Sequence, residues 1–213
     1  MAHSSIIARE GWPYIGIFVL LTIFMTVIWY NFYLLIPLGL AIFSAFFFRN
    51  PERNASADEG LILSPADGKI MEINTVWEDQ YLKSSAIQVR IFLSLFNVHI
   101  NRVPLTGEVE WLARSGSTYL PAYKKEAGST NVSNYVGIHS SNGKIMVVQI
   151  TGLVARRLVC WLKLGDQVQR GERLGLIKFG SCTELYLPVS AEILVQPGEK
   201  VRGGETIIGQ FSN

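Results

Sequence analysis

The chain has 213 residues, which is enough for one ordinary domain and an additional segment. Its 19 basic and 17 acidic residues give a net charge of +2, too balanced to support nucleic-acid binding on electrostatic grounds. Hydrophobic residues make up 49% of the chain, a high share for a soluble protein. The two cysteines, Cys160 and Cys182, have no metal-ligand spacing and indicate neither a metal site nor a disulfide framework. A reducing compartment is therefore the simpler expectation.

The hydrophobic excess is concentrated in residues 11–48, which contain no charged side chain. One membrane helix needs about 20 apolar residues, so a stretch of roughly 38 predicts two short transmembrane helices with a turn at residues 29–33. Asn31 is the expected turn residue, and Pro37 is expected early in the second helix, where proline is tolerated. A cleaved secretory signal is the alternative, but its apolar region spans only about 7–15 residues and ends in small residues.

Arginines flank this apolar stretch on both sides, with Arg9 before it and Arg49 and Arg53 after it. Because positive residues favour the cytoplasmic side, both ends of the hairpin and the following domain are expected in the cytoplasm, at the cell membrane. The expected organisation is an N-terminal tail and membrane anchor over residues 1–48, a linker over residues 49–60 and a second domain over residues 61–213.

From Leu61 onward, Gly, Pro, Asn and Asp recur between short runs of β-branched and aromatic residues. This pattern predicts a mainly β domain built from many short strands. No long amphipathic helix is indicated, and residues 151–156 are a weak candidate for a short one. The expected strands are 69–76, 86–93, 107–113, 134–139, 144–150, 158–162, 173–178, 183–187, 191–194 and 206–211.

An internal repeat relates residues 165–174 to residues 198–207. Gly165 and Gly171 of the first copy correspond to Gly198 and Gly204 of the second, and each copy predicts a turn, a short strand, a turn and a strand. Such units assemble small barrel-sandwich folds, which is the predicted architecture. Biotinyl and lipoyl carriers contain a similar repeat and display a lysine on a hairpin. The loop between the two copies does not display a lysine in this way, which disfavours a carrier domain but leaves it open as an alternative.

The first repeat copy leads directly into Gly180 and Ser181. A serine hydroxyl after a glycine can attack the glycine carbonyl, because glycine tolerates the strained backbone that this geometry requires. Taken alone, such a pair is more commonly an ordinary strand start or bulge. The context favours the first interpretation.

Residues 170–181, Arg-Gly-Glu-Arg-Leu-Gly-Leu-Ile-Lys-Phe-Gly-Ser, are followed by Glu-Leu-Tyr-Leu-Pro. This stretch closely resembles the self-cleavage region of phosphatidylserine decarboxylase proenzymes of the short, archaetidylserine decarboxylase-like type. Three other segments resemble the same family in the same order, namely 63–70 (Leu-Ser-Pro-Ala-Asp-Gly-Lys-Ile), 96–104 (Phe-Asn-Val-His-Ile-Asn-Arg-Val-Pro) and 152–157 (Gly-Leu-Val-Ala-Arg-Arg). Many short members carry an arginine where this chain has Cys182, a difference that concerns local substrate contacts rather than cleavage.

Cleavage of an amide by a serine hydroxyl needs a base, which a third group orients. His3 lies in the N-terminal tail and His139 in an expected surface turn, which leaves His99. From the residue pattern alone, His99 would be a structural histidine and Asp67 an ordinary turn aspartate. The resemblance instead implies a catalytic triad of Asp67, His99 and Ser181.

The resemblance also implies the chemistry. Ser181 would attack the carbonyl of Gly180, and the chain would divide into a β chain of residues 1–180 and an α chain of residues 181–213. Ser181 would become a covalent pyruvoyl cofactor, which forms a Schiff base with phosphatidylserine and releases carbon dioxide to give phosphatidylethanolamine. No metal is expected.

The cleavage and decarboxylation steps share few candidate side chains. Longer relatives carry a second histidine three residues along, where this chain has Arg102, so His99 is a candidate for both steps. A headgroup with a phosphodiester and a carboxylate calls for cations, and the candidates are Arg102, Lys124 and Arg156. Each of these is by default a solvated surface residue.

The expected partners are the phospholipid substrate, the membrane, and the α and β chains of one precursor, with a homodimer left open and no nucleic acid. One alternative is the same reaction on an ether lipid, archaetidylserine. Two others belong to different classes: a non-enzymatic, membrane-anchored barrel-sandwich adaptor, and a carrier of a lysine-linked prosthetic group.

Overall fold

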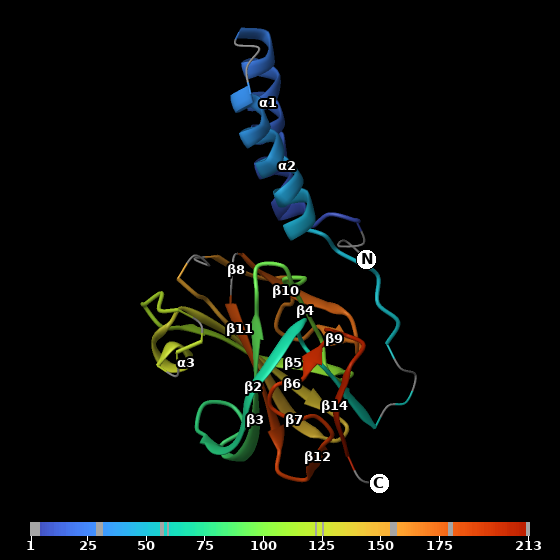
Figure 1. Ribbon diagram of the computed structural model, residues 1–213. Helices are drawn as coiled ribbons and strands as arrows, with labels where there is room; N and C mark the ends of the chain where they lie inside the picture. The colour runs from blue at the N-terminus through green and yellow to red at the C-terminus, as the bar shows by residue number, and fades with distance from the viewer. Residues whose placement is uncertain are drawn as a thin grey trace. The chain divides into compact units, whose positions relative to one another are not determined.

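The computed structural model describes residues 5–28, 32–55, 58, 60–121, 123–124, 126–153, 157–178 and 181–211 (Figure 1). The chain forms two compact units, Met1–Glu52 and Arg53–Asn213. The boundary between them falls within the predicted linker, residues 49–60. The first unit is helical and the second is made mainly of β strands.

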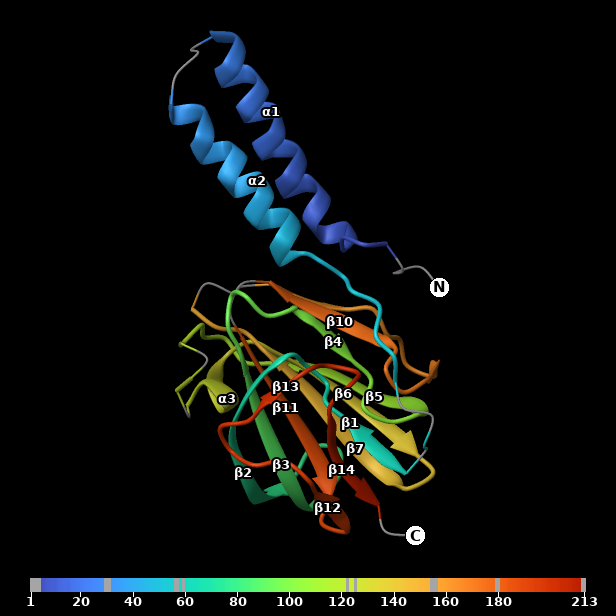
Figure 2. The ribbon, with the colours of Figure 1, turned by 45° about the vertical axis from the view of Figure 1, so that its right-hand side comes forward.

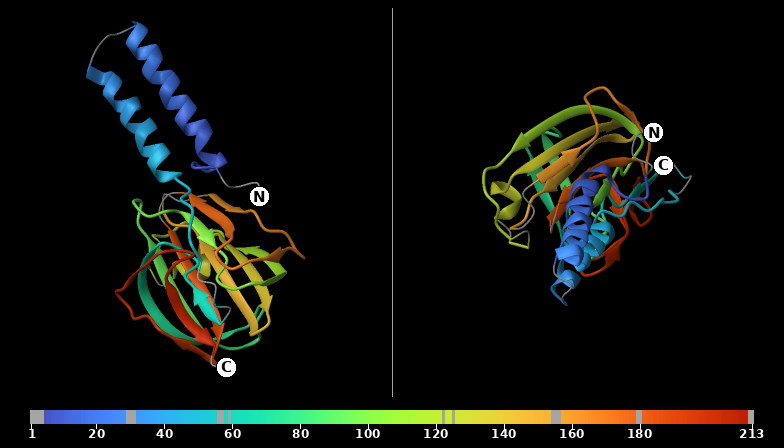
Figure 3. Two further views of the ribbon diagram at one scale, coloured as in Figure 1. Left: turned by 90° about the vertical axis from the view of Figure 1, so that its right-hand side faces the viewer. Right: turned by 90° about the horizontal axis from the view of Figure 1, so that it is seen from above.

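The helical unit is a hairpin of two apolar helices that lie side by side in the two views of Figure 3. A backbone hydrogen bond from the N–H of Ala8 to the carbonyl of Phe48 (2.8 Å) closes its open end. The ring of Tyr14 stacks on that of Phe48, with 5.4 Å between the centroids. The elements are η1 (Arg9–Gly11), α1 (Trp12–Ile28), η2 (Phe32–Leu34) and α2 (Leu35–Phe47).

Within the described residues, one helical segment is long and apolar enough to cross a bilayer. The helical segment Arg9–Ile28 has 20 residues and a mean hydropathy of 2.0. Helix α2 has 13 residues, which corresponds to about 20 Å, whereas the hydrocarbon core is about 30 Å thick. The two predicted apolar helices are present, but that both of them cross the membrane stays a prediction. Pro37 lies in the first turn of α2, as predicted, and Asn31 lies outside the described residues.

The second unit confirms the mainly β prediction. An eight-stranded sheet has the order β13-β2-β3-β11-β7-β6-β5-β9, and two three-stranded sheets have the orders β4-β10-β8 and β1-β14-β12. Figure 2 shows the large sheet curling, with β4 and β10 near one end of it and β12 and β14 near the other. The strands are β1 (Leu61–Leu63), β2 (Gly68–Glu78), β3 (Ser84–Leu93), β4 (Ile100–Arg102), β5 (Gly107–Ser115), β6 (Ser133–Ser140), β7 (Gly143–Ile150), β8 (Arg157–Cys160), β9 (Gln167–Val168), β10 (Arg173–Lys178), β11 (Ser181–Pro188), β12 (Ala191–Ile193), β13 (Lys200–Val201) and β14 (Ile207–Phe211).

Every predicted strand overlaps an observed one, because alternating side chains in these segments divide between two faces. On the inner face, Ile91, Val147 and Leu185 come from neighbouring strands and are fully buried in one large apolar cluster. The strands that were not predicted are β1, β4, β9 and β13, each of two or three residues. The short helix α3 (Ala127–Thr130) was not predicted either. Residues 151–153 are not helical, and residues 154–156 lie outside the described part of the chain.

The predicted repeat is confirmed at the level of the backbone. Gly165 and Gly198 have φ values of +85° and +99°, and Gly171 and Gly204 have values of +80° and +76°. These left-handed conformations favour glycine. Between the glycines of each pair lie the two-residue strands β9 and β13. The two copies therefore use the same turns to build equivalent parts of the unit.

The structure extends this repeat to two further segments, residues 64–70 and 103–109. Val168 of the first copy pairs with Gly107, and Val201 of the second pairs with Gly68. A Cβ atom on Gly68 would overlap the carbonyl of Phe92, and one on Gly107 would overlap the carbonyl of His139. Both positions therefore require glycine for lack of space.

Gly68→Ala and Gly107→Ala should each lower the free energy of unfolding by about 2 kcal/mol, because backbone must move to admit the methyl group. Gly60→Ala is the matched control, since its Cβ would meet only ordinary contacts at 3.5 and 3.9 Å, and it should change stability by less than about 0.5 kcal/mol. Denaturant unfolding of the full chain in detergent measures both. Equal stability of all three variants would refute the steric argument.

Candidate active site

Ser181 is the first residue of β11, and this strand is central in the large sheet. The register pairs Ser181 with Leu93 of β3, and pairs Cys182 with Ile150 of β7. Ser181 is 0% exposed, and its Oγ has no hydrogen-bond partner within the described part of the chain. A buried hydroxyl without a partner costs about 1–3 kcal/mol and calls for an explanation. Gly180, and with it the predicted scissile bond, lies outside the described residues.

The two faces of β11 carry different chemistry. By strand alternation, Ser181 and Thr183 share the inner face, on which Leu185 joins the large apolar cluster. Cys182 lies on the other face, where Arg90 Nε donates a hydrogen bond to its Sγ (3.3 Å). Burial raises the pKa of the Cys182 thiol to about 12. This thiol is therefore neutral near pH 7 and is not a competing nucleophile.

His99 is fully buried and immediately precedes β4, a strand that sequence patterns did not predict. The Nδ1 atom of its ring lies 3.0 Å from the carbonyl oxygen of Asn97. A carbonyl can only accept a hydrogen bond, so this contact assigns the hydrogen to Nδ1 and the lone pair to Nε2 in the neutral ring. The backbone carbonyl of His99 accepts a hydrogen bond from Ile177 (3.1 Å).

A side-chain hydrogen bond joins β4, which follows His99, to β11, which begins with Ser181. Asn101 Nδ2 donates to Thr183 Oγ1 at 2.8 Å, and both side chains are 0% exposed. His99 precedes Asn101 by two residues, and Ser181 precedes Thr183 by two. This hydrogen bond therefore lies two residues from each of the two predicted site residues. The hydrogen bond from the Ile177 N–H also ties the backbone of His99 to β10, the strand that precedes Ser181 in the chain.

Two more buried amides complete this polar cluster. Gln149 on β7 donates from Nε2 to Asn101 Oδ1 (2.9 Å), and Asn134 on β6 donates to Gln149 Oε1 (3.3 Å). Asn101 Nδ2 also reaches the carbonyl of Pro65 at 3.3 Å. Sequence reasoning missed these residues, although Asn101 and Thr183 each stand two positions after a predicted site residue. We call Asn101, Thr183, Gln149 and Asn134 the amide cluster.

Asp67 has other partners within the described chain. Its carboxylate accepts two hydrogen bonds from Arg53 Nη2 (3.2 and 2.9 Å) and one from the N–H of Gly203 (2.8 Å). The contact with Gly203 has an equivalent in the other repeat, where the N–H of Arg170 donates to Thr106 Oγ1 (3.2 Å). The contact with Gly203 is therefore part of the structure that the two repeat copies and their paired segments share, which we call the duplicated scaffold. The ion pair with Arg53 has no such equivalent among these contacts. The role of Asp67 in orienting His99 stays a prediction.

The predicted headgroup cations occupy different environments. Arg102 on β4 is only 4% exposed, and its Nη1 donates to the carbonyl of Gly171 (2.8 Å), an arrangement that favours a structural role. Lys124 is exposed, and its carbonyl accepts a hydrogen bond from Arg90 Nη2 (2.8 Å). Arg156 lies outside the described residues.

A cavity of about 490 Å³ lies on the face of β11 opposite to the Ser181 hydroxyl. Its lining includes Glu184, which approaches Arg90 Nε at 3.5 Å and accepts a hydrogen bond from Tyr186 (2.8 Å). Burial raises the pKa of the Glu184 carboxyl, which Tyr186 and Arg90 counteract. Ser181 and His99 are not part of the lining, so this cavity is separate from the candidate site.

Comparisons with known proteins identify the family. A family model described as phosphatidylserine decarboxylase matches residues 40–209. A protein named phosphatidylserine decarboxylase proenzyme, from Carboxydothermus hydrogenoformans, is 45% identical over 213 residues and 99% of each chain. Proteins of the same name from Symbiobacterium thermophilum (98% of this chain, 97% of the relative) and Syntrophus aciditrophicus (99% and 100%) are each 43% identical. As the resemblance of residues 170–181 predicted, the chain belongs to the phosphatidylserine decarboxylase family.

Proposed function

We propose that this chain is a membrane-associated phosphatidylserine decarboxylase, which cleaves itself before Ser181 and converts phosphatidylserine into phosphatidylethanolamine and carbon dioxide. The observation that carries the proposal is the buried hydroxyl of Ser181, which has no hydrogen-bond partner in the described chain and stands two residues before Thr183, the residue that Asn101 of β4 holds. The names of the relatives support the same substrate. No observation favours the adaptor, the carrier or the ether-lipid substrate.

Self-cleavage begins when Ser181 Oγ attacks the carbonyl carbon of Gly180. His99 Nε2 takes the hydroxyl proton and returns it to the departing backbone nitrogen, so the amide becomes an ester. Loss of the Cα proton of residue 181 then breaks its Cβ–O bond and releases the carboxylate of Gly180. Tautomerisation and addition of water expel ammonia and leave a pyruvoyl group at the start of the α chain.

The position of Ser181 fits such a group. The residue is buried at the start of β11, so the group derived from it would be shielded from water. Conversion of the side chain would break no hydrogen bond, because Ser181 Oγ has no partner within the described chain. The pyruvoyl group would supply a carbonyl that accepts electrons as carbon dioxide leaves the substrate.

His99 is the residue that we propose for proton transfer in both steps. The carbonyl of Asn97 holds the Nδ1 hydrogen and therefore fixes the orientation of the ring. In cleavage the ring acts as a base, and after decarboxylation its conjugate acid returns a proton to the substrate carbon. We propose Lys124 and Arg156 for the headgroup anions and keep Asp67 as the third member of the triad.

The amide cluster positions the cut end of the α chain. Once the bond between residues 180 and 181 is broken, the covalent connection from β10 to β11 is lost. Asn101 of β4 still holds Thr183 of β11, and Gln149 holds Asn101, so β4 and β11 keep their relative positions. This positioning would contribute to both cleavage and turnover.

The membrane association is proposed from the apolar helix Arg9–Ile28. Arginines at both ends of the helical hairpin favour a cytoplasmic location of the second unit. The processed α and β chains of the same precursor would form the mature protein, with phospholipid as the substrate.

Ser181→Ala should abolish cleavage because no hydroxyl remains to attack Gly180. Intact mass and a denaturing gel should show one chain for the variant, and two fragments for the unaltered protein, the smaller being residues 181–213 with a ketone-reactive end. His99→Gln should slow cleavage by at least about 100-fold. Recovery of the unaltered protein as a single chain with an ordinary serine would refute the proposal.

Asp67→Asn should slow cleavage more than Arg53→Gln if Asp67 orients His99. Both variants break the same ion pair (2.9 Å), so both should lose stability, which thermal unfolding measures. Cleavage rates come from a time course after cell-free synthesis. Equal slowing by the two variants, in proportion to their loss of stability, would assign Asp67 to the scaffold alone.

Thr183→Val should slow cleavage by about 10- to 100-fold, because it keeps the shape of the side chain but removes the hydroxyl that Asn101 holds. Thr183→Ser is the matched control and should mature at a rate near that of the unaltered chain. In the mature fraction, Thr183→Val should lower kcat without changing KM. Normal maturation of Thr183→Val would show that the amide cluster does not position Ser181.

A further inference from the structure

The turn between β3 and β4 exposes two apolar side chains at one end of the β unit. Leu95 is 39% exposed and Phe96 is 70% exposed. The turn is closed by Asn97, whose Oδ1 accepts hydrogen bonds from the N–H (2.9 Å) and the hydroxyl (2.7 Å) of Ser94. The N–H of Asn97 donates to the carbonyl of Ser94 (3.0 Å). These contacts hold the backbone of the turn, on which the two apolar side chains are exposed. We call residues 94–97 the apolar turn.

The apolar turn is attached directly to both candidate catalytic residues. Leu93, which precedes it, pairs with Ser181 in the large sheet. Asn97, its last residue, provides the carbonyl that holds the His99 ring at 3.0 Å. A molecule that contacts the turn therefore lies next to the buried site.

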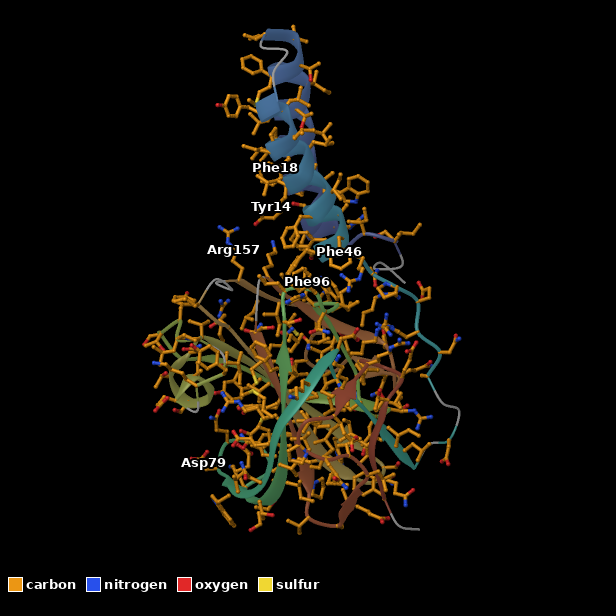
Figure 4. The ribbon with its side chains drawn as sticks, in the orientation of Figure 1. Tyr14, Phe18, Phe46, Asp79, Phe96 and Arg157 are labelled. Atoms are coloured by element: carbon orange, nitrogen blue, oxygen red, sulfur yellow. The ribbon has the colours of Figure 1, made fainter. Side chains whose placement is uncertain are left out.

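Basic and apolar residues from other strands lie at the same end. Ile150 at the end of β7 pairs with Cys182, and Leu153 just beyond it is 59% exposed. Arg157, an exposed residue at the start of β8, pairs with Lys178 at the end of β10. Figure 4 shows Phe96 and Arg157 near one end of the β unit, with Asp79 toward the opposite end.

We propose that the apolar turn inserts into an anionic lipid bilayer, with Arg157 and Lys178 against the lipid phosphates, and presents the headgroup of a bilayer lipid to residue 181. The inference rests on the proposed function, since it identifies the bilayer as the place where the site meets its substrate. Apolar tips flanked by basic residues bind anionic membranes by combining hydrophobic burial with electrostatic attraction.

The small size of the tip favours a bilayer over a protein partner. A stable protein interface buries about 800 Å² on each side, far more than two side chains on a four-residue turn provide. A bilayer needs only that a few apolar groups enter the interfacial region, and this chain already carries an apolar helix of spanning length, Arg9–Ile28.

The first test compares two substrates for the full chain with Leu95→Ser and Phe96→Ser combined. Decarboxylation of phosphatidylserine in vesicles should fall at least about tenfold in kcat/KM, because the burial of a phenylalanine is lost. Decarboxylation of a short-chain phosphatidylserine, dissolved as monomers, should stay within about twofold. Intact mass verifies that the variant still cleaves itself.

Trp77→Ser is the matched control. Trp77 is 69% exposed and pairs with Ser85, at the other end of β3 from Leu93, so its loss should change neither reaction. Equal losses of the apolar-turn variant on both substrates, or no loss on vesicles, would overturn the inference. The inference would also be overturned if the variant lost activity on vesicles only when cell lysate is added, because the turn would then bind a protein and not the bilayer.

A second test needs no turnover and therefore separates this inference from the proposed function. The full chain with Phe96→Trp is reconstituted in anionic vesicles whose acyl chains carry bromine, and its fluorescence is compared with that of the unaltered chain. Additional quenching relative to the unaltered chain is expected, and Arg157→Gln should reduce it. Absence of additional quenching would overturn the inference even if the enzyme decarboxylates phosphatidylserine normally.

Discussion

The proposed chemistry depends on β11 keeping its place when the peptide bond before it breaks. All eight residues of β11 pair with β3 on one side, and residues from Cys182 to Tyr186 pair with β7 on the other. A central strand satisfies its backbone groups on both edges, so it does not need the chain that leads into it. The fold can therefore contain a chain break at residue 181 without releasing the α chain.

Buried polar groups set the geometry at this end of the unit. Asn101, Gln149 and Thr183 are all 0% exposed, and each makes a hydrogen bond to another member of the amide cluster. A satisfied polar cluster fixes one arrangement, because any other arrangement would leave a buried amide unpaired. Ser181 Oγ is different, because within the described chain it lies beside this cluster without a hydrogen bond. This contrast supports the proposal that Ser181 is the reactive group and that the amide cluster holds it in place.

The duplicated scaffold explains why residue type alone does not assign a role. Asp67 and Thr106 occupy equivalent positions, and each accepts a hydrogen bond from the backbone of the adjacent repeat copy. The hydrogen bond from Gly203 to Asp67 thus belongs to the repeated backbone structure. Asp67 also pairs with Arg53 (2.9 Å), and Arg53 in turn pairs with Glu205 (2.9 Å). Only the first repeat copy continues into Ser181, so the candidate site is attached to one copy of the repeat and not to the other.

By itself, the sequence determined the apolar helices, the longer strands, the repeat and the family, because each of these is recorded in a local pattern or a contiguous motif. Tertiary structure alone decided the short strand β4, since three residues carry no periodicity and form a strand only where β10 pairs with them. It also decided that Asn101 holds Thr183, 82 positions away in the chain. Such a contact follows from the packing of two sheets and the direction of each side chain, which no neighbouring residues encode.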